Sequence, residues 1–281
     1  MNAAECARQV SDVFVLPETC LKIKEIIDNH VSDMDEIAEL IQFDPVLSSR
    51  LLKLANSALY SFPQQVDSVE KAVLLLGENQ VYNLVVAYGA AEAFATIDPK
   101  VIQLERFWEQ SIYCALLAKY LGLKANLNPK DPVYLTGLLH NLGELVMIEV
   151  NPDAARKCQL GLSDQHPWQL QQQVLGFTYA DCSAELLRCW QLPQRLVSPL
   201  LHLHQPELSQ GIRVNLVIHI AACCAISLIN KERYPLKNLL DMQLVAQAGL
   251  TEEQLQEAMD FAVLEGMAIL SLLNPSLFTV L

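Results

Sequence analysis

The chain has 281 residues, of which 52% are apolar and 18% charged. So apolar a sequence can bury a large core, which excludes an intrinsically disordered protein. The 32 acidic residues outnumber the 19 basic ones and give a formal net charge of −13. No segment gathers Lys and Arg, and a phosphate backbone requires a basic surface, so we expect no nucleic acid among the partners.

The cysteines and the N-terminus indicate the compartment. Eight cysteines are scattered along the chain without any CxxC pair, and the first ten residues lack the apolar core of a signal peptide. We therefore expect reduced thiols and a cytoplasmic protein.

One uncharged stretch, from Val214 to Asn230, is about as long as a short membrane-spanning helix. It contains Asn215 and His219, which are costly in lipid. This composition favours a buried helix of a large core, so we expect no membrane span.

The apolar residues of nearly every segment recur with the helical period, and the alternation typical of strands is scarce. In the first hundred residues, Ser32 or Asp33, Asp44 and Ser68 are predicted N-caps, and Gly77 is a stop. The helix after Asp44 is expected to bury Leu47, Leu51, Leu52, Leu54 and Ala55. The expected elements here are Thr19–Asn29, a helix through Ile37 to Ile41, one from Pro45 through Ala55, one from Ser68 to Gly77, and the apolar run Val81–Phe94.

Asp98-Pro99 is the predicted break between two lobes, 1–97 and 98–281. In the second lobe, Asn151-Pro152 is expected to stop a helix, and the Thr251-x-x-Gln254 capping box to open the last one. The expected helices are Val101–Leu121, Tyr134–Val150, Trp168–Leu175, Tyr179–Trp190, Gln194–His202, Val214–Asn230 and Thr251–Leu272. The sequence thus predicts an all-α protein, a two-lobed helical bundle.

The motifs of the common enzyme classes are absent: there is no Walker loop, GxGxxG, GxSxG or HExxH. Among the histidines, we expect His166 to be solvated in a polar loop and His219 to be a satisfied core residue. His140 and Asn141 differ, because they place a polar pair inside an apolar segment, where burial costs free energy unless both are hydrogen-bonded. Glu144, one turn further on, is a candidate partner for His140.

Several segments in order resemble the HDOD domain of the HD superfamily of metal-dependent phosphohydrolases. Gly137–Leu145 is similar to the GLLHDIGKL helix of that superfamily, with Asn141 in place of the Asp. The resemblance runs from about Val15 to Pro206, and the residues after it are expected to form a helical extension. It implies a bacterial signal-transduction module whose C-terminal lobe is HD-like. The other matching segments are Leu16-Pro17, Ala38–Ile41, Asp44–Leu47, Arg50–Ala58, Ala72–Gly77, Phe107-Trp108-x-x-Ser111 and Trp190-x-Leu192-Pro193.

The resemblance also implies where the divalent-metal site of the superfamily would lie. Its ligand positions fall at Gln110, His140, Asn141, Tyr179, His204 and Ala222. Only the two histidines are good ligands, and the carboxylates that would hold an ion and acidify its water are missing. A shift of this alignment by one turn would bring in Asp181 as a ligand.

We therefore expect a vestigial pocket with no catalytic residue, no metal and no cofactor, in a regulatory module that acts through signalling protein partners. The alternative is a metal-dependent phosphohydrolase, a phosphodiesterase or phosphomonoesterase, with atypical ligands. The apolar run Val81–Val86 offers a face on which a second copy of the chain can pair.

Overall fold

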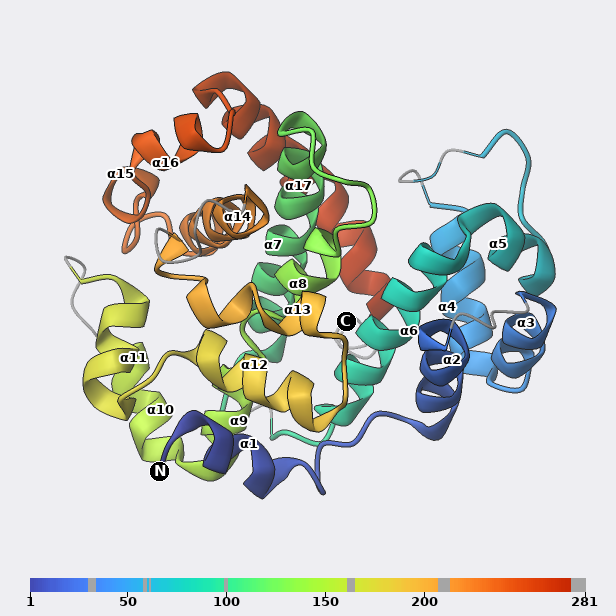
Figure 1. Ribbon diagram of the computed structural model, residues 1–281, viewed down its shortest axis with the longest axis horizontal. Coiled ribbons are helices and arrows are strands. Elements are labelled where there is room, and N and C mark those ends of the chain that lie inside the picture. The colour runs from blue at the N-terminus through green and yellow to red at the C-terminus, as the bar shows by residue number, and fades with distance from the viewer. Residues whose placement is uncertain are drawn as a thin grey trace, which may run out of the picture. The chain divides into compact units, whose positions relative to one another are not determined.

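The computed structural model describes residues 1–29, 34–57, 60, 62–98, 101–160, 165–206 and 213–273, with side chains up to 270. Every regular element in these ranges is a helix (Figure 1). The predicted all-α class is confirmed.

The chain forms two compact units. The smaller unit comprises Val15–Thr96 and the residues from Met267 onward, and the larger comprises Met1–Phe14 and Ile97–Gly266. The boundary at Ile97 lies next to the predicted break at Asp98, whereas Pro99 is outside the described residues. The last helix, α17, begins in the larger unit, and its final residues belong to the smaller one.

The smaller unit is built around α6, which contacts α2, α4 and α5. Its core contains the fully buried side chains of Ile23, Ile37, Ile41, Leu47 and Leu51. The bounds of its helices are α2 Glu18–Asp28, α3 Met34–Gln42, α4 Pro45–Ala55, α5 Val69–Leu76 and α6 Glu78–Ala93.

The larger unit is organised by α7, the long helix that packs against both α8 and α14 (Figure 1). Its side chains Trp108, Ile112, Leu116 and Leu117 are fully buried at this centre. The bounds of the helices in this unit are α1 Ala3–Val10, α7 Leu104–Lys124, α8 Val133–Leu139, α9 Leu142–Val150, α10 Pro152–Gln159, α11 Pro167–Leu175, α12 Tyr179–Cys189, α13 Gln194–Val197, the short 3₁₀ helix η1 Leu200–His202, α14 Arg213–Ile229, α15 Leu236–Leu239, α16 Met242–Gln247 and α17 Glu252–Leu273.

The predicted helix starts are confirmed where the structure describes them. The Asp44 carboxylate accepts hydrogen bonds from the N–H groups of Val46 and Leu47, and Ser68 Oγ accepts one from Lys71. Thr251 and Gln254 form the expected reciprocal capping box. Ser32 and Asp33 lie outside the described residues.

The core stripe of α4 differs from the prediction at two positions. Leu47, Leu51, Leu54 and Ala55 are buried as expected, whereas Leu52 is half-buried. The helix also buries a charged residue, because Arg50 pairs with Glu92 at 3.3 Å and lies over the Tyr88 ring, 4.4 Å from its centroid.

The prediction of one continuous helix from Tyr134 to Val150 is wrong. The chain forms α8, a turn at His140 and Asn141, and then α9. Ser183 on α12 explains the break, because its hydroxyl donates to the His140 carbonyl at 2.9 Å and accepts from the Gly143 N–H at 2.8 Å. These contacts satisfy the backbone groups that the interrupted helix leaves open.

Two further boundaries also differ. Asn151-Pro152 stops α9 as expected but immediately opens α10, because the Asn151 side chain caps it and Pro suits its first position. The expected helix Gln194–His202 is divided into α13 and η1.

The first fourteen residues do not belong to the predicted first lobe. Helix α1 has an apolar face, Cys6, Ala7 and Val10, and this face is buried where α1 packs on α9 and α12. The Phe14 carbonyl also accepts a hydrogen bond from the Trp190 indole at 2.8 Å. Both contacts are within the larger unit.

The Val81–Val86 face considered for pairing with a second copy is not exposed. These residues of α6 are buried except Asn83, which is half-buried, and α2, α4 and α5 of the same unit pack on this helix.

No described helix is both long enough and apolar enough to cross a bilayer. All eight cysteines are unpaired, and all but Cys189 are buried.

Candidate functional site: a polar pocket at the α8–α9 turn

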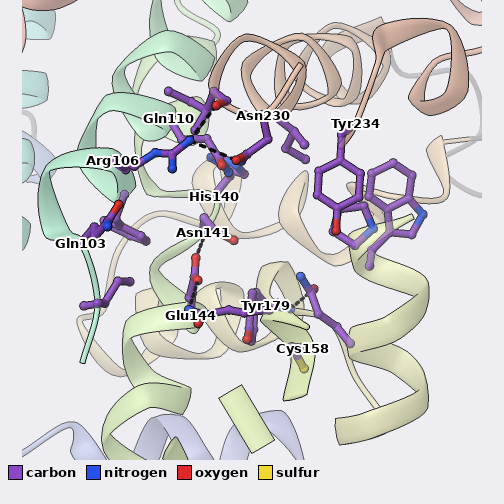
Figure 2. A pocket seen from close by; sticks show the side chains of 18 of the residues that line it. Gln103, Arg106, Gln110, His140, Asn141, Glu144, Cys158, Tyr179, Asn230 and Tyr234 are labelled. Carbon is purple, nitrogen blue, oxygen red and sulfur yellow. Dashed lines mark hydrogen bonds between the residues drawn. The ribbon is translucent and has the colours of Figure 1, made fainter. Parts of the chain in front are cut away.

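A pocket of about 590 Å³ opens in the larger unit, where the α8–α9 turn faces the beginning of α7 and the end of α14 (Figure 2). This volume is in the range of small-molecule sites. Helices α10, α11 and α12 contribute further wall residues, among them Gln159, Gln171 and Tyr179. The site is thus assembled from segments more than a hundred residues apart in the sequence.

His140 lies in the α8–α9 turn and is only 3% exposed. Its Nδ1–H donates to the Gly137 carbonyl at 2.7 Å, which leaves the lone pair on Nε2. Burial lowers the pKa of this imidazole to about 4, against the smaller raising effect of the Gly137 hydrogen bond. His140 is therefore neutral at pH 7.

Glu144 does not hydrogen-bond to His140, contrary to the sequence-based expectation. Its carboxylate instead accepts from the Asn141 side-chain amide at 2.6 Å and from the Gln159 amide at 3.4 Å (Figure 2). Burial raises the pKa of this carboxyl, and the two amide hydrogen bonds only partly oppose the shift. The Asn141 amide and the Glu144 carboxylate are thus hydrogen-bond partners of each other.

Tyr179, at the beginning of α12, is 4% exposed and lies near Glu144 and Cys158. Burial, followed by the neighbouring Glu144 carboxyl, raises the pKa of its hydroxyl far above the ordinary range. Burial likewise raises the pKa of the Cys158 thiol. Both groups are therefore protonated at physiological pH, and neither is an anionic nucleophile there.

A stack of rings closes another side of the pocket. The His204 imidazole lies parallel to the Trp168 indole, with centroids 4.4 Å apart and planes within 5°. The His166 ring packs edge-on against the Trp168 indole, with centroids 4.5 Å apart. His166 is half-buried, whereas the sequence predicted a solvated residue. Burial is the main cause that lowers the pKa of His204 well below its usual value, and the nearby imidazoles add to it.

His219 is the core histidine that the sequence predicts. It is 4% exposed, and its Nδ1–H donates to the Leu203 carbonyl at 2.8 Å. Its Nε2 lies 3.6 Å from the Cys223 thiol.

Five of the six positions carried over from the family line this one pocket: Gln110, His140, Asn141, Tyr179 and His204. The sixth, Ala222, is fully buried and does not line it. One turn further along α14, Ile226 does. Asp181 is not a hidden ligand here, because its carboxylate accepts from the N–H and hydroxyl of Thr178, both at 2.8 Å, in the α12 cap.

Two basic residues line the pocket that no pattern in the sequence predicts. Arg106 on α7 donates from Nη2 to the Ile229 carbonyl at 2.8 Å and to Asn230 Oδ1 at 3.1 Å (Figure 2). Arg233 follows α14 and also lines the pocket. Neither is part of a motif, and the proximity of Arg106 to the site depends on the packing of α7 against α14.

The profile of the HDOD domain family matches residues 13–206. The chain belongs to the HDOD domain family. An "Uncharacterized protein" of Treponema pallidum (strain Nichols) is 30% identical over 208 residues, which are 72% of this HDOD chain and 39% of that relative. The chain thus spans well under half the length of that relative.

Solved structures have the same fold. A "Putative phosphohydrolase" from Shewanella amazonensis SB2B aligns with a TM-score of 0.74 at 23% identity, over 96% of this chain and 98% of the other. An HDOD domain protein of unknown function from Geobacter sulfurreducens aligns with a TM-score of 0.72 at 20% identity, again over 96% and 98%. The two alignments show that the chain shares its helical fold with these proteins.

The donor set of this HDOD pocket does not fit a hydrolytic metal centre. In the described part of the chain, no three His, Cys, Asp or Glu side chains lie close enough together to hold an ion. The pocket offers two imidazoles, amides, a neutral phenol and the thiol of Cys158, and Glu144 is already engaged by Asn141. A hydrolytic Zn²⁺ or two-metal site is held by imidazole, carboxylate or thiolate ligands and keeps a position open for the attacking water.

The buried histidine predicts a specific pH dependence. Because the pKa of His140 is about 4 in the folded chain and about 6.5 when unfolded, the unfolded state binds more protons between these values. We expect the free energy of unfolding to fall as the pH drops below about 6.5, by roughly 3 kcal/mol from this group at pH 4. Urea unfolding of wild type and His140→Gln over this pH range separates the contribution of His140 from that of the carboxylates. Only the wild type should show the additional fall in the free energy of unfolding that protonation of His140 causes. Parallel curves for the two proteins would contradict the assignment.

Proposed function

We propose that the protein is a non-catalytic regulatory module of the HDOD type, which acts through contacts with signalling proteins and without a bound metal or cofactor. The observation that carries this proposal is the Asn141–Glu144 pair. At the position where the superfamily has a metal-binding Asp, this chain has the amide of Asn141. That amide donates a hydrogen bond to the Glu144 carboxylate at 2.6 Å.

The chemistry of hydrolysis supports the same conclusion. A metal-bound hydroxide forms near neutral pH only where the ion is held firmly and polarises its water strongly. His140 and His204 lie on the pocket wall, but the remaining family positions hold Gln110, Asn141, Tyr179 and Ala222. Neutral amides and a protonated phenol hold a divalent ion weakly, so the water would keep a pKa too high for attack at pH 7.

Exposed apolar side chains on the smaller unit support a protein partner. Phe43 is 80% exposed and Leu74 is 75% exposed. Gln42, next to Phe43, donates a hydrogen bond to Glu70, and Leu74 lies one turn beyond Glu70 on the same face of α5. Large apolar side chains exposed on a surface can mark interaction sites. We assign the partner surface to this region of α3 and α5.

The unpaired thiols support a reducing compartment. Eight free cysteines, seven of them buried, suit the cytoplasm, where disulfides are rare. We propose that the protein works there.

The proposal predicts a protein without stoichiometric metal. Protein purified without chelators should contain well under one Mn, Fe, Zn or Mg ion per chain by mass spectrometry. It should not hydrolyse phosphomonoesters or cyclic dinucleotides when Mn²⁺ or Mg²⁺ is added. Asn141→Asp should remain inactive, because Gln110, Tyr179 and Ala222 still supply no anionic ligand.

The alternative, a metal-dependent phosphohydrolase with atypical ligands, has one supporting feature, the two imidazoles and Glu144 in one pocket. A stoichiometric ion, together with hydrolysis that His140→Ala abolishes and His202→Ala retains, would establish this alternative and overturn the proposal. His202 is a suitable control, because it is a histidine of the same unit that does not line this pocket.

A further inference from the structure

Helices α3 and α5 of the smaller unit carry acidic and large apolar side chains on the same exposed faces. On α3, the exposed residues Glu36, Glu39 and Phe43 are spaced i, i+3 and i+7, which places them on one side of the helix. Phe43 continues the helical turn, because its N–H donates to the Glu39 carbonyl at 3.3 Å. On α5, the exposed residues Glu70 and Leu74 are one turn apart. Each helix thus presents both carboxylate and apolar surface to solvent.

The exposed faces of the two helices meet. Helices α3 and α5 pack against each other, and the Gln42 side-chain amide donates a hydrogen bond to the Glu70 carboxylate across the contact. Gln42 directly precedes Phe43 on α3, and Leu74 follows Glu70 by one turn on α5. The two rows of side chains therefore form one surface, which we call the α3–α5 face.

The acidic charge of the α3–α5 face is not neutralised from within the chain. Among the described residues, no Lys or Arg forms an ion pair with Glu36, Glu39 or Glu70. Lys71, the basic residue beside Glu70, pairs instead with Asp67 at 3.6 Å. Three carboxylates on an apolar surface, in a chain of net charge −13, attract a basic partner.

Charge and apolarity together select the class of partner. An anionic membrane or a nucleic acid would be repelled by the carboxylates. A second copy of the chain, paired through the same face, would bring like charges together. A purely polar cation would leave Phe43 and Leu74 exposed to water. The complementary partner is therefore both apolar and basic.

We propose that the α3–α5 face binds a basic amphipathic helix of a partner protein. The apolar stripe of that helix packs on Phe43 and Leu74, since such helices present apolar side chains every three or four residues. Its flanking Lys and Arg side chains pair with Glu36, Glu39 and Glu70, because their long stems can cross apolar surface while the charge reaches a carboxylate. The inference rests on the proposed function, which assigns the partner surface to this region, and it adds the chemistry of the partner.

Fluorescence anisotropy with labelled synthetic peptides tests the proposal on the full chain. The probe is a peptide of about 18 residues, or five helical turns, with Leu on one helical face and Lys on the rest. One control peptide has Glu in place of every Lys, and another has Ser in place of every Leu. We expect the probe to bind with a Kd below about 100 μM, and both control peptides to bind at least about tenfold more weakly.

Variants of the protein locate the binding. Phe43→Ala and Leu74→Ala should each weaken the probe at least about tenfold, and Glu39→Lys should weaken it at least about fivefold. Glu25→Lys is the matched charge control, because Glu25 is exposed on α2 of the same unit. Leu160→Ala is the matched apolar control, because Leu160 is exposed at the end of α10 in the larger unit. Both controls should bind the probe as wild type does.

Four results would overturn the proposal. The first is a probe that does not bind below about 100 μM. The second is equal affinity of Glu39→Lys and Glu25→Lys, which would mean that the probe responds only to net charge. The third is binding of vesicles of phosphatidylglycerol and phosphatidylcholine that Leu74→Ala abolishes, since the face would then be a membrane contact. The fourth is a dimer in analytical ultracentrifugation that Leu74→Ala dissociates.

The outcomes for this face and for the proposed function are distinguishable. If the probe does not bind while the protein is free of metal and hydrolyses no phosphoester, the basic partner is refuted and the non-catalytic role stands. If the probe binds through the α3–α5 face and the protein hydrolyses phosphoesters with added Mn²⁺, the basic partner is supported and the non-catalytic role is refuted.

Discussion

Leu51→Ala should lower the free energy of unfolding by about 2–5 kcal/mol. Leu51 is fully buried at the centre of α4, among the other core residues of the smaller unit. Truncation removes the transfer free energy of three carbon atoms and leaves a cavity that the surrounding helices fill only in part. Urea unfolding followed by circular dichroism measures the loss.

Leu74→Ala is the matched control for this substitution. It removes the same atoms from a helix of the same unit, but Leu74 is 75% exposed, so the change should stay within about 0.5 kcal/mol of wild type. If the two variants were equally stable, the buried face of α4 would be assigned incorrectly. The same control leaves the fold intact for tests of the α3–α5 surface.

The parts of the fold that local sequence signals determine were predictable. Asp44 and Ser68 cap their helices with their own side chains, and the apolar period of α4 identifies four of its five expected core positions. Such signals act over three or four residues, so a pattern in the sequence is enough to find them.

The missed features depend on contacts between distant segments. The break between α8 and α9 is stabilised by Ser183, forty residues beyond Gly143, and no local pattern reveals it. Arg50 can be buried because its guanidinium pairs with the Glu92 carboxylate and lies over the Tyr88 ring, both on another helix. In both cases tertiary contacts override the local preference.

Residues of the candidate site could be predicted from the sequence only where a family motif fixed their position. The motif around His140 and the positions of Gln110, Tyr179 and His204 brought five residues to one pocket. The prediction that Ala222 lines the pocket was wrong, because the α14 segment has no motif to fix its alignment. Ile226, one turn later, lines the pocket instead. Arg106 and Arg233 lack any local signal. Arg106 reaches the pocket through the packing of α7 on α14, whereas Arg233 lies in the turn after α14 and donates to the Gln159 carbonyl.

Gly143→Ala should be among the most destabilising single substitutions in the larger unit, with a loss of about 3 kcal/mol or more. A Cβ at this position would lie 2.7 Å from Cys182 Cβ and 2.9 Å from the Tyr179 carbonyl carbon, and closer still to the Tyr179 carbonyl oxygen. Backbone atoms of α12 cannot turn aside as a flexible side chain can, so α9 and α12 would have to separate. The Gly143 N–H would then also lose its hydrogen bond to Ser183, 2.8 Å away.

Gly122→Ala provides the comparison, because Gly122 also lies within a helix of the larger unit. Its added Cβ would meet only side-chain methyl groups, Val133 Cγ2 at 3.3 Å and Leu127 Cδ1 at 3.5 Å, while Ala gains up to about 1 kcal/mol of helix propensity. We expect this variant to stay within about 1 kcal/mol of wild type in urea unfolding, and Gly143→Ala to lose its near-ultraviolet circular dichroism at much lower urea. Equal stability of the two would mean that α9 and α12 do not approach as closely as described.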